Sequence, residues 1–229
     1  MRIKFNERGV TLVELLVVMV IAGIVVAGFY RIFIAQSRAY TVQDQVAEVQ
    51  QDIRNAMEIL VRDLSMTGFD YDNTTSAIHI PNIPYQVAGN SITVWYEYYQ
   101  KDPSNPLGPP LISEAHAITY TLNGTTLERQ LTVDGGNATT EALLRNVEAL
   151  DFTCGRDGII GDEATQDGVV DHWVNCGTID MNRDKVIALR ISLTARPVQA
   201  NPEDDRLKMI TPRTLTSTVA LRNLALKKM

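Results

Sequence analysis

The two cysteines of the chain, Cys154 and Cys176, are the residues most suited to forming a covalent cross-link. They enclose a polar loop, and a disulfide between them would restrict the unfolded chain by closing a loop of about 22 residues. An even number of cysteines favours a disulfide when the domain is exported. A zinc site that adds His172 to both sulfurs is the alternative, although the paired short spacings of such sites are absent.

Oxygen-bearing side chains alternate at Asp180, Asn182 and Asp184, as they do at the opening of a calcium-binding loop. Lys185 stands where such a loop has glycine, and no glutamate follows at the expected distance. The segment therefore predicts either a calcium site, helped by other acidic residues nearby, or a solvated acidic turn. A calcium-dependent rise in melting temperature would favour the first interpretation.

The sequence shows no set of residues that suggests catalysis. The three histidines have no serine or cysteine pattern beside them that would form a nucleophile and its base. The formal net charge is -6, and no cluster of lysine and arginine suggests a surface for nucleic acid. We therefore expect no enzyme, no nucleic acid bound by a basic patch, and no cofactor other than the possible calcium ion.

Glu14 is the only charged residue before Arg31 in an apolar run from Val10 to Phe33. As a helix, this run of 24 residues spans roughly 36 Å, enough for a hydrocarbon core of about 30 Å. A carboxylate within a membrane costs ~2.5–3.5 kcal/mol and needs a partner. That partner is an N-terminal amine, its own or a neighbour's, unless Glu14 reaches the headgroups.

Basic residues precede the apolar run at positions 2, 4 and 8, and none lies within it before Arg31. The positive-inside rule then predicts a single pass with a cytoplasmic N-terminus and an exported C-terminal part. A cleaved secretory signal peptide would need a small-residue cleavage site after the apolar run, and the candidates there are poor.

The apolar run with Glu14 should belong to one long helix, because no proline occurs before Pro81. We expect it to run from Val10 to about Thr67 and to stop at Gly68. Its second half has apolar residues at helical spacing, which should pack on a head: Val46, Val49, Ile53, Met57, Leu60 and Leu64. A free coiled coil is the competing interpretation.

The chain after the helix has the pattern of β-strands. We expect strands at residues 91–99, 147–153, 186–194 and 214–222, and a hairpin that joins 117–122 to 125–133 across Asn123-Gly124. The predicted fold is α+β: a long helix, half transmembrane and half amphipathic, on a mainly antiparallel sheet. The predicted segments are a leader (1–9), a transmembrane helix (10–34), an amphipathic helix (35–68) and a head (69–229).

Residues 8–16 read Arg-Gly-Val-Thr-Leu-Val-Glu-Leu-Leu, which resembles the class III signal of type IV pilins and type II secretion pseudopilins. The resemblance implies that a prepilin peptidase cuts after Gly9 and methylates Val10. It also implies that Glu14 neutralises the amine of a neighbouring subunit and sets the register of assembly. Val10 stands where the family usually has phenylalanine.

Three further patches, at residues 61–69, 146–150 and 218–223, resemble the PilW family of minor pilins. This resemblance implies a structural subunit that helps to start or cap a pilus and supports adhesion, motility or DNA uptake. Its partners would be other minor and major pilins, the peptidase, the inner-membrane assembly platform and lipid. Before assembly the subunit would be anchored in the bacterial inner membrane with its head in the periplasm, and it would then enter the pilus. A J-type minor pseudopilin of type II secretion is the alternative, followed by a membrane-tethered ligand-binding protein.

Overall fold

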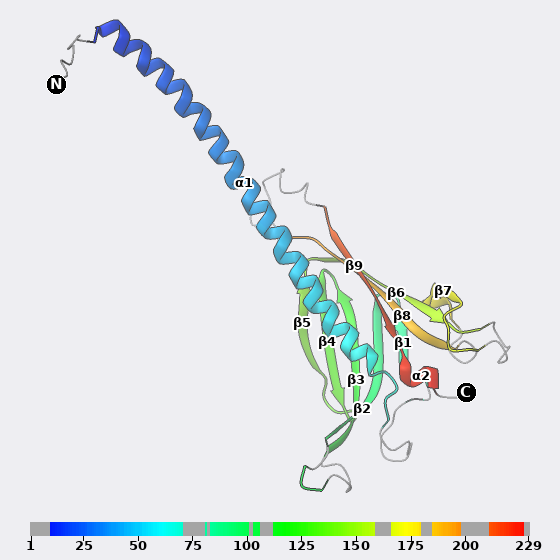
Figure 1. Ribbon diagram of the computed structural model, residues 1–229. Helices are drawn as coiled ribbons and strands as arrows, with labels where there is room; N and C mark the ends of the chain where they lie inside the picture. Colours follow the sequence, from blue (N-terminus) through cyan, green and yellow to red (C-terminus); the bar gives the residue numbers. More distant parts are fainter. Residues whose placement is uncertain are drawn as a thin grey trace, which may run out of the picture. The chain divides into compact units, whose positions relative to one another are not determined.

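The computed structural model describes residues 10–70, 81, 83–100, 103–105, 112–158, 166–179, 185–197 and 211–226. The chain divides into two compact units, Met1–Gln45 and Val46–Met229, and each is described by itself. The fold is α+β, with a long first helix followed by strands in two antiparallel sheets (Figure 1). The predicted fold class is thus confirmed.

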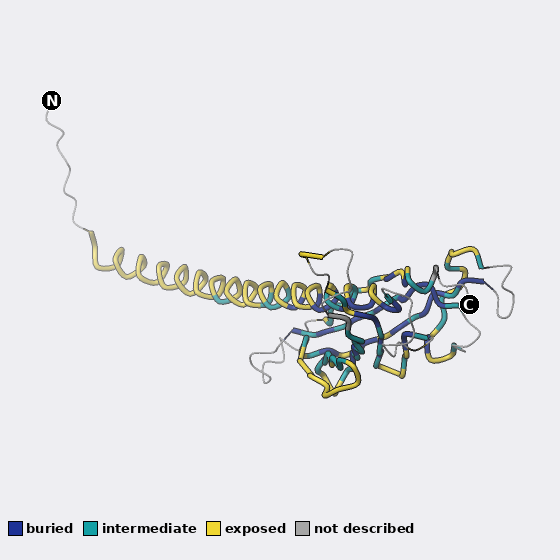
Figure 2. Tube along the Cα trace, turned by 90° about the horizontal axis from the view of Figure 1, so that it is seen from below, coloured by how far each residue is buried: buried dark blue, intermediate teal, exposed yellow. Residues whose placement is uncertain are grey.

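Helix α1 spans Leu12–Ser65, close to the predicted range. In the first unit its apolar side chains are exposed except for the half-buried Ile34 and Val42, and Figure 2 shows this part of the helix as mostly exposed. In the second unit the predicted stripe packs into the core, and only Val46 is half-buried. The buried residues of α1 are Val49, Ile53, Ala56, Met57, Leu60, Asp63 and Leu64.

The strands of the head form two sheets rather than the one sheet that we expected. The first has five strands in the order β1-β2-β3-β4-β5, and the second has four in the order β7-β6-β8-β9. The first sheet comprises β1 (Tyr85–Ala88), β2 (Ser91–Gln100), β3 (Ile112–Asn123), β4 (Thr126–Val133) and β5 (Thr139–Arg145). The second comprises β6 (Val147–Arg156), β7 (His172–Asn175), β8 (Val186–Ala195) and β9 (Arg213–Ala220); a 3-10 turn, η2 (Cys176–Thr178), follows β7, and α2 (Arg222–Leu226) follows β9.

The predicted hairpin is present as β3 and β4, but its turn is displaced by one residue. Asn123 pairs with Thr126, so the turn consists of Gly124 and Thr125. Gly124 has φ +61°, and this glycine at the first turn position is the pattern of a type II′ turn. The Asn-Gly pair therefore predicted the hairpin, although only its glycine occupies the turn itself.

Asn146 forms the corner at which the chain leaves the first sheet for the second. Its φ is +57°, in the left-handed region that asparagine tolerates better than most residues. Its carbonyl oxygen accepts a hydrogen bond from the Arg196 amide at 2.9 Å, and the next amide, that of Val147, donates to Thr125 at 2.9 Å. The corner is therefore held to both sheets.

Residues of α1 and of both sheets form one core. The strands contribute every second side chain to this core, since side chains alternate between the two faces of a strand. In β2, Ile92 and Val94 are buried. Thr93 lies on the other face, where its hydroxyl is 2.8 Å from the hydroxyl of Thr119. A polar group also lies inside this core. Asp63 of α1 accepts hydrogen bonds from the Tyr120 hydroxyl at 2.7 Å and from Arg129 Nε at 2.8 Å.

The C-terminal end of α1 is held by contacts with β2 and with the last part of the chain. Gly68 has φ +72°, and its amide donates to the carbonyl of Trp95 at 2.9 Å. The Asn223 side chain donates to the Thr67 carbonyl at 3.1 Å, which satisfies one of the acceptors that a helix end leaves free. The contact between Asn223 and Thr67 joins two of the segments that resemble PilW, residues 61–69 and 218–223.

Candidate functional site

The first turn of α1 is a capping box built from Thr11 and Glu14. The Glu14 amide donates to Thr11 Oγ1 at 3.3 Å, and Glu14 Oε2 accepts from the Thr11 amide at 3.4 Å and from its hydroxyl at 3.3 Å. The box satisfies donors that a helix start leaves free, and it holds a carboxylate at the positive end of the helix dipole. Glu14 thus has a local partner within its own chain.

Val10 precedes this box directly and is exposed, with 72% of its surface accessible. Gly9, after which we predict cleavage, lies outside the described residues. Cleavage there would create a new amine on Val10, next to Thr11 and one turn from Glu14. The processing residues and the assembly role of Glu14 stay predictions, and the local role of Thr11 is an addition that sequence reasoning missed.

Most apolar side chains of the first unit are exposed among the residues that the structure describes. Leu12, Met19, Phe29 and Phe33 are each more than 60% exposed. Among the described residues, α1 is the one helix long and apolar enough to cross a membrane. Exposed apolar surface of this extent marks a place that lipid or other proteins cover. The helix is thus suited to membrane anchoring.

The predicted disulfide is confirmed. Cys154 on β6 and Cys176 in η2 are joined with an S–S distance of 2.04 Å and a Cα–Cα distance of 5.0 Å. Both residues are buried, and both sulfurs are used by the bond, so neither is a thiolate that could bind zinc. The disulfide ties the segment after β7 to the central pair of the second sheet.

The acidic residues inside the disulfide loop hold its backbone. Asp157 is buried, and its two carboxylate oxygens accept from the amides of Asp167 at 3.0 Å and Gly168 at 3.1 Å. Lys185 Nζ lies 3.7 Å from the same carboxylate. Asp171 accepts from the amide of Gly158 at 2.7 Å. These carboxylates therefore accept hydrogen bonds from backbone amides of the loop and stabilise its conformation.

Asp180, Asn182 and Asp184, the predicted calcium ligands, lie outside the described residues. Within the part of the chain that the structure describes, no group of three histidine, cysteine, aspartate or glutamate residues could hold a metal ion. A calcium site at these three positions stays a prediction.

The aromatic cluster of β2 divides along the strand. Tyr96 is buried, whereas Tyr98 on the same face is 45% exposed and stacks on His116 at 5.2 Å. On the other face, Tyr99 stacks on Phe69 at 5.9 Å. On the face of Tyr96 and Tyr98, burial therefore ends between these two residues.

Comparison with known proteins gives two family matches. Residues 4–30 match the prokaryotic N-terminal methylation motif, and residues 112–223 match the family described as Type IV Pilus-assembly protein W. The first match covers the capping box and the apolar helix. The second covers the head from β3 into α2.

Two individual proteins are similar to this chain. The pilin-like protein PilA3 of Thermus thermophilus is 28% identical over 228 residues, which cover 91% of this chain and 88% of that protein. A solved type IV-like pilin from Thermus thermophilus has a TM-score of 0.45 and 13% identity, over 77% of this chain and 98% of that one.

A methylation motif, an exposed apolar helix and an antiparallel β head together define a type IV pilin-like protein, a structural subunit of a pilus. The match of the head reaches from β3 into α2 and covers residues 112–223, just under half of the chain. The chain is a type IV pilin-like protein whose head resembles the family of pilus-assembly protein W.

Proposed function

We propose that this chain is a minor pilin that acts in the assembly of the pilus, as part of a short complex that starts or caps the fibre. The prepilin is anchored in the bacterial inner membrane with a cytoplasmic N-terminus and a periplasmic head. Prepilin peptidase cuts after Gly9 and methylates Val10. The subunit then joins other minor and major pilins at the assembly platform, and the fibre supports adhesion, motility or DNA uptake.

The observation that carries this proposal is the carboxylate of Glu14 at the start of an exposed apolar helix. A capping box needs only a hydrogen-bond acceptor at this position, which an uncharged glutamine supplies as well as a glutamate. In an apolar assembly the same carboxylate needs a cation, and the amine created at Val10 of a neighbouring subunit supplies one. Exchange of the local partner Thr11 for that amine would join two subunits.

The test compares Glu14→Ala with Asp44→Ala in cells that lack the native copy. Asp44 is also an exposed carboxylate on α1, but it lies beyond the apolar run. We expect Glu14→Ala to enter the membrane and to be processed normally, as judged by mass spectrometry of its N-terminus, yet to give few or no pili. Asp44→Ala should assemble like the wild type. Normal piliation by Glu14→Ala would contradict the proposal.

The alternative is a minor pseudopilin of a type II secretion system, which would use the same anchor and a similar head. Affinity purification of the processed chain from cross-linked membranes separates the two functions. Recovery of pilus subunits supports the proposal, and recovery of secretion subunits without pilins supports the alternative.

A further inference from the structure

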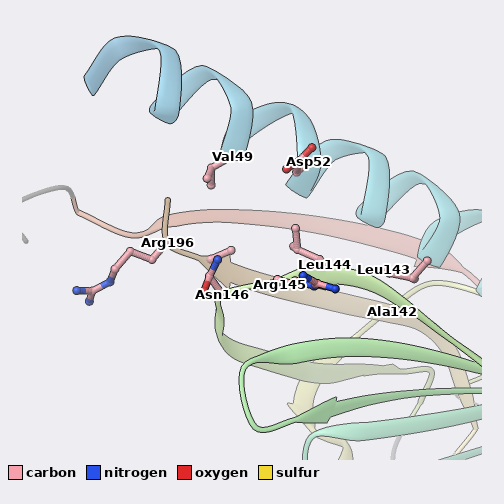
Figure 3. A pocket seen from close by; sticks show the side chains of 9 residues that line it. Val49, Asp52, Ala142, Leu143, Leu144, Arg145, Asn146 and Arg196 are labelled. Carbon is pink, nitrogen blue, oxygen red and sulfur yellow. The ribbon is translucent and has the colours of Figure 1, made fainter. Parts of the chain in front are cut away.

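A groove with a volume of about 300 Å³ lies within the head, between α1 and the corner where β5 passes into β6 (Figure 3). Val49 and Asp52 of α1 form one side. The opposite side is formed by residues 142–145 of β5 and by Asn146. The end is formed by Ala195, the last residue of β8, and by Arg196, which follows it.

The groove follows the backbone edge of β5. Side chains of a strand alternate between two faces, so a wall made of four successive residues is a strand edge and not a face. Among the described strands, β5 is the last of its sheet and pairs with β4 alone. Among the described residues, no backbone group outside the sheet bonds to residues 142–144. The groove therefore offers unpaired amide and carbonyl groups to a ligand.

The edge is open only over a short length. The pairing with β4 shifts between Leu127 and Glu128, which leaves Leu143 as an extra residue opposite that step. Such a bulge interrupts a regular ladder and protects an edge against full-length pairing. A segment of a few residues fits this edge, whereas a long strand does not.

Charge and polarity restrict the ligand further. Leu144, Ala195 and Val49 give the groove a buried apolar floor. Arg145 is exposed and forms no ion pair with any residue that the structure describes, although Asp52 lines the opposite side. Arg196, by contrast, pairs with Glu148. The guanidinium of Arg145 is thus available to a carboxylate, on a chain whose net charge is -6.

We propose that this groove binds a short extended segment of a neighbouring pilin-type subunit. The segment pairs its backbone with the edge of β5, places an apolar side chain over Val49 and Leu144, and directs an acidic side chain to Arg145. A peptide is favoured over a small anion because backbone edge, apolar floor and cation are all present in one groove. The inference rests on the proposed function, since the partner is another subunit of the same assembly.

Photo-cross-linking in the piliated host tests the groove. The full-length chain carries p-benzoylphenylalanine at position 142 or, as a control, at position 54; Ala142 and Arg54 are both exposed, and Arg54 does not line the groove. We expect adducts from position 142 with a subunit that has a prepilin signal, identified by mass spectrometry. Position 54 should not give this adduct.

The charge contact is tested by adding Arg145→Glu or, as its matched control, Arg54→Glu to the position-142 probe. Loss of a charge-assisted contact and its replacement by repulsion should lower the adduct yield at least about tenfold for Arg145→Glu. Arg54→Glu should leave the yield unchanged. Because Arg145 is exposed, its variant should also keep the melting temperature of the parent chain.

Three results would overturn the inference: no pilin adduct from position 142, an adduct only with a second copy of this chain, or a yield that Arg145→Glu does not change. Failure of the proposed function has a different signature, namely fibres that form without Glu14. If fibres require Glu14 and position 142 gives no adduct, the groove assignment is wrong and the assembly role stands.

Discussion

Asp63 is a single residue whose partners explain how α1 is held on the first sheet. Its carboxylate is buried and accepts from both Tyr120 and Arg129, and Arg129 also pairs with the exposed Glu141 at 3.0 Å. Removal of Asp63 would take the hydrogen-bond acceptor from the buried Tyr120 hydroxyl and one of two carboxylate partners from Arg129, which costs more than the pair contributes. The network therefore fixes the position of α1 on β3 and β4.

Tyr120 should make the stability of the head depend on pH in the alkaline range. Burial, and next the hydrogen bond to Asp63, raise the pKa of Tyr120 above its ordinary value of 10.0. Above that pH the unfolded chain releases the proton while the folded chain keeps it, so the free energy of unfolding falls as the pH rises. Below pH 10 the contribution is fully present. Burial also raises the pKa of Tyr96, which adds to the same loss.

Tyr120→Phe tests this account. At neutral pH it should lower the free energy of unfolding by about 1–2 kcal/mol, because Asp63 loses a hydrogen bond. Above pH 10 the variant should lose stability less steeply than the wild type, as measured by urea unfolding at several pH values. Tyr98→Phe is the control, since Tyr98 is 45% exposed. Parallel pH curves for Tyr120→Phe and the wild type would refute the role of Tyr120.

At the scale of elements, the end of α1 depends on a glycine with close neighbours. A Cβ atom on Gly68 would lie 2.9 Å from Pro84 Cγ and 3.1 Å from Leu224 Cδ2, and its φ of +72° is unfavourable for other residues. Gly68→Ala should therefore destabilise the head by about 2–3 kcal/mol, from backbone strain and overpacking together.

Gly89→Ala is a matched control for the packing part of this effect. Gly89 has φ +60°, but a Cβ atom there would meet nothing within 4 Å. Its cost should be the backbone strain alone, about 1 kcal/mol. Thermal unfolding of both variants measures the difference. Equal losses of stability would show that the contacts with Pro84 and Leu224 do not matter.

The disulfide is the covalent link within the second sheet. Its removal in the double variant Cys154→Ala and Cys176→Ala should lower the free energy of unfolding by about 3 kcal/mol, because the unfolded chain gains freedom. Reductant should lower the melting temperature of the wild type and leave that of the double variant unchanged. If reductant destabilises both chains alike, the effect does not come from this bond.

At the scale of the whole molecule, sequence periodicity predicted the long helix and most strands but not their division into two sheets. The stripe of α1 and the alternation in β8 are local patterns, and local patterns are visible in one sequence. β5 was missed because Thr-Thr-Glu-Ala-Leu-Leu-Arg has little β-propensity, and its pairing with β4 decides its structure. The sequence signal that could have indicated the corner is the residue type of Asn146, because asparagine tolerates the left-handed region that this position has.

Some residues of the candidate sites could be predicted from the sequence and others could not. Glu14 stands out in the sequence because a charge in an apolar run is costly, and the cysteine pair stands out by its number. Asp63 and the groove beside Arg145 do not, because their partners lie far along the chain. Asp63 and Arg129 are 66 residues apart, and the groove joins α1 to the ends of β5 and β8. Contacts of that range depend on strand register, which the sequence patterns did not determine.

The division of the chain into two units predicts that the head folds without its anchor. Every residue of the core cluster lies at or after Val49, so a chain that starts at Val46 keeps all of it. We expect this truncated chain to be folded, with a melting temperature that differs from that of the full chain in detergent by less than about 4 °C. A second truncation that starts at residue 59 is the control, because it removes Val49, Ile53 and Met57, each worth ~1.5–3 kcal/mol when buried. Circular dichroism during heating compares the two, and a first truncation that is unfolded would show that residues 1–45 contribute to the core.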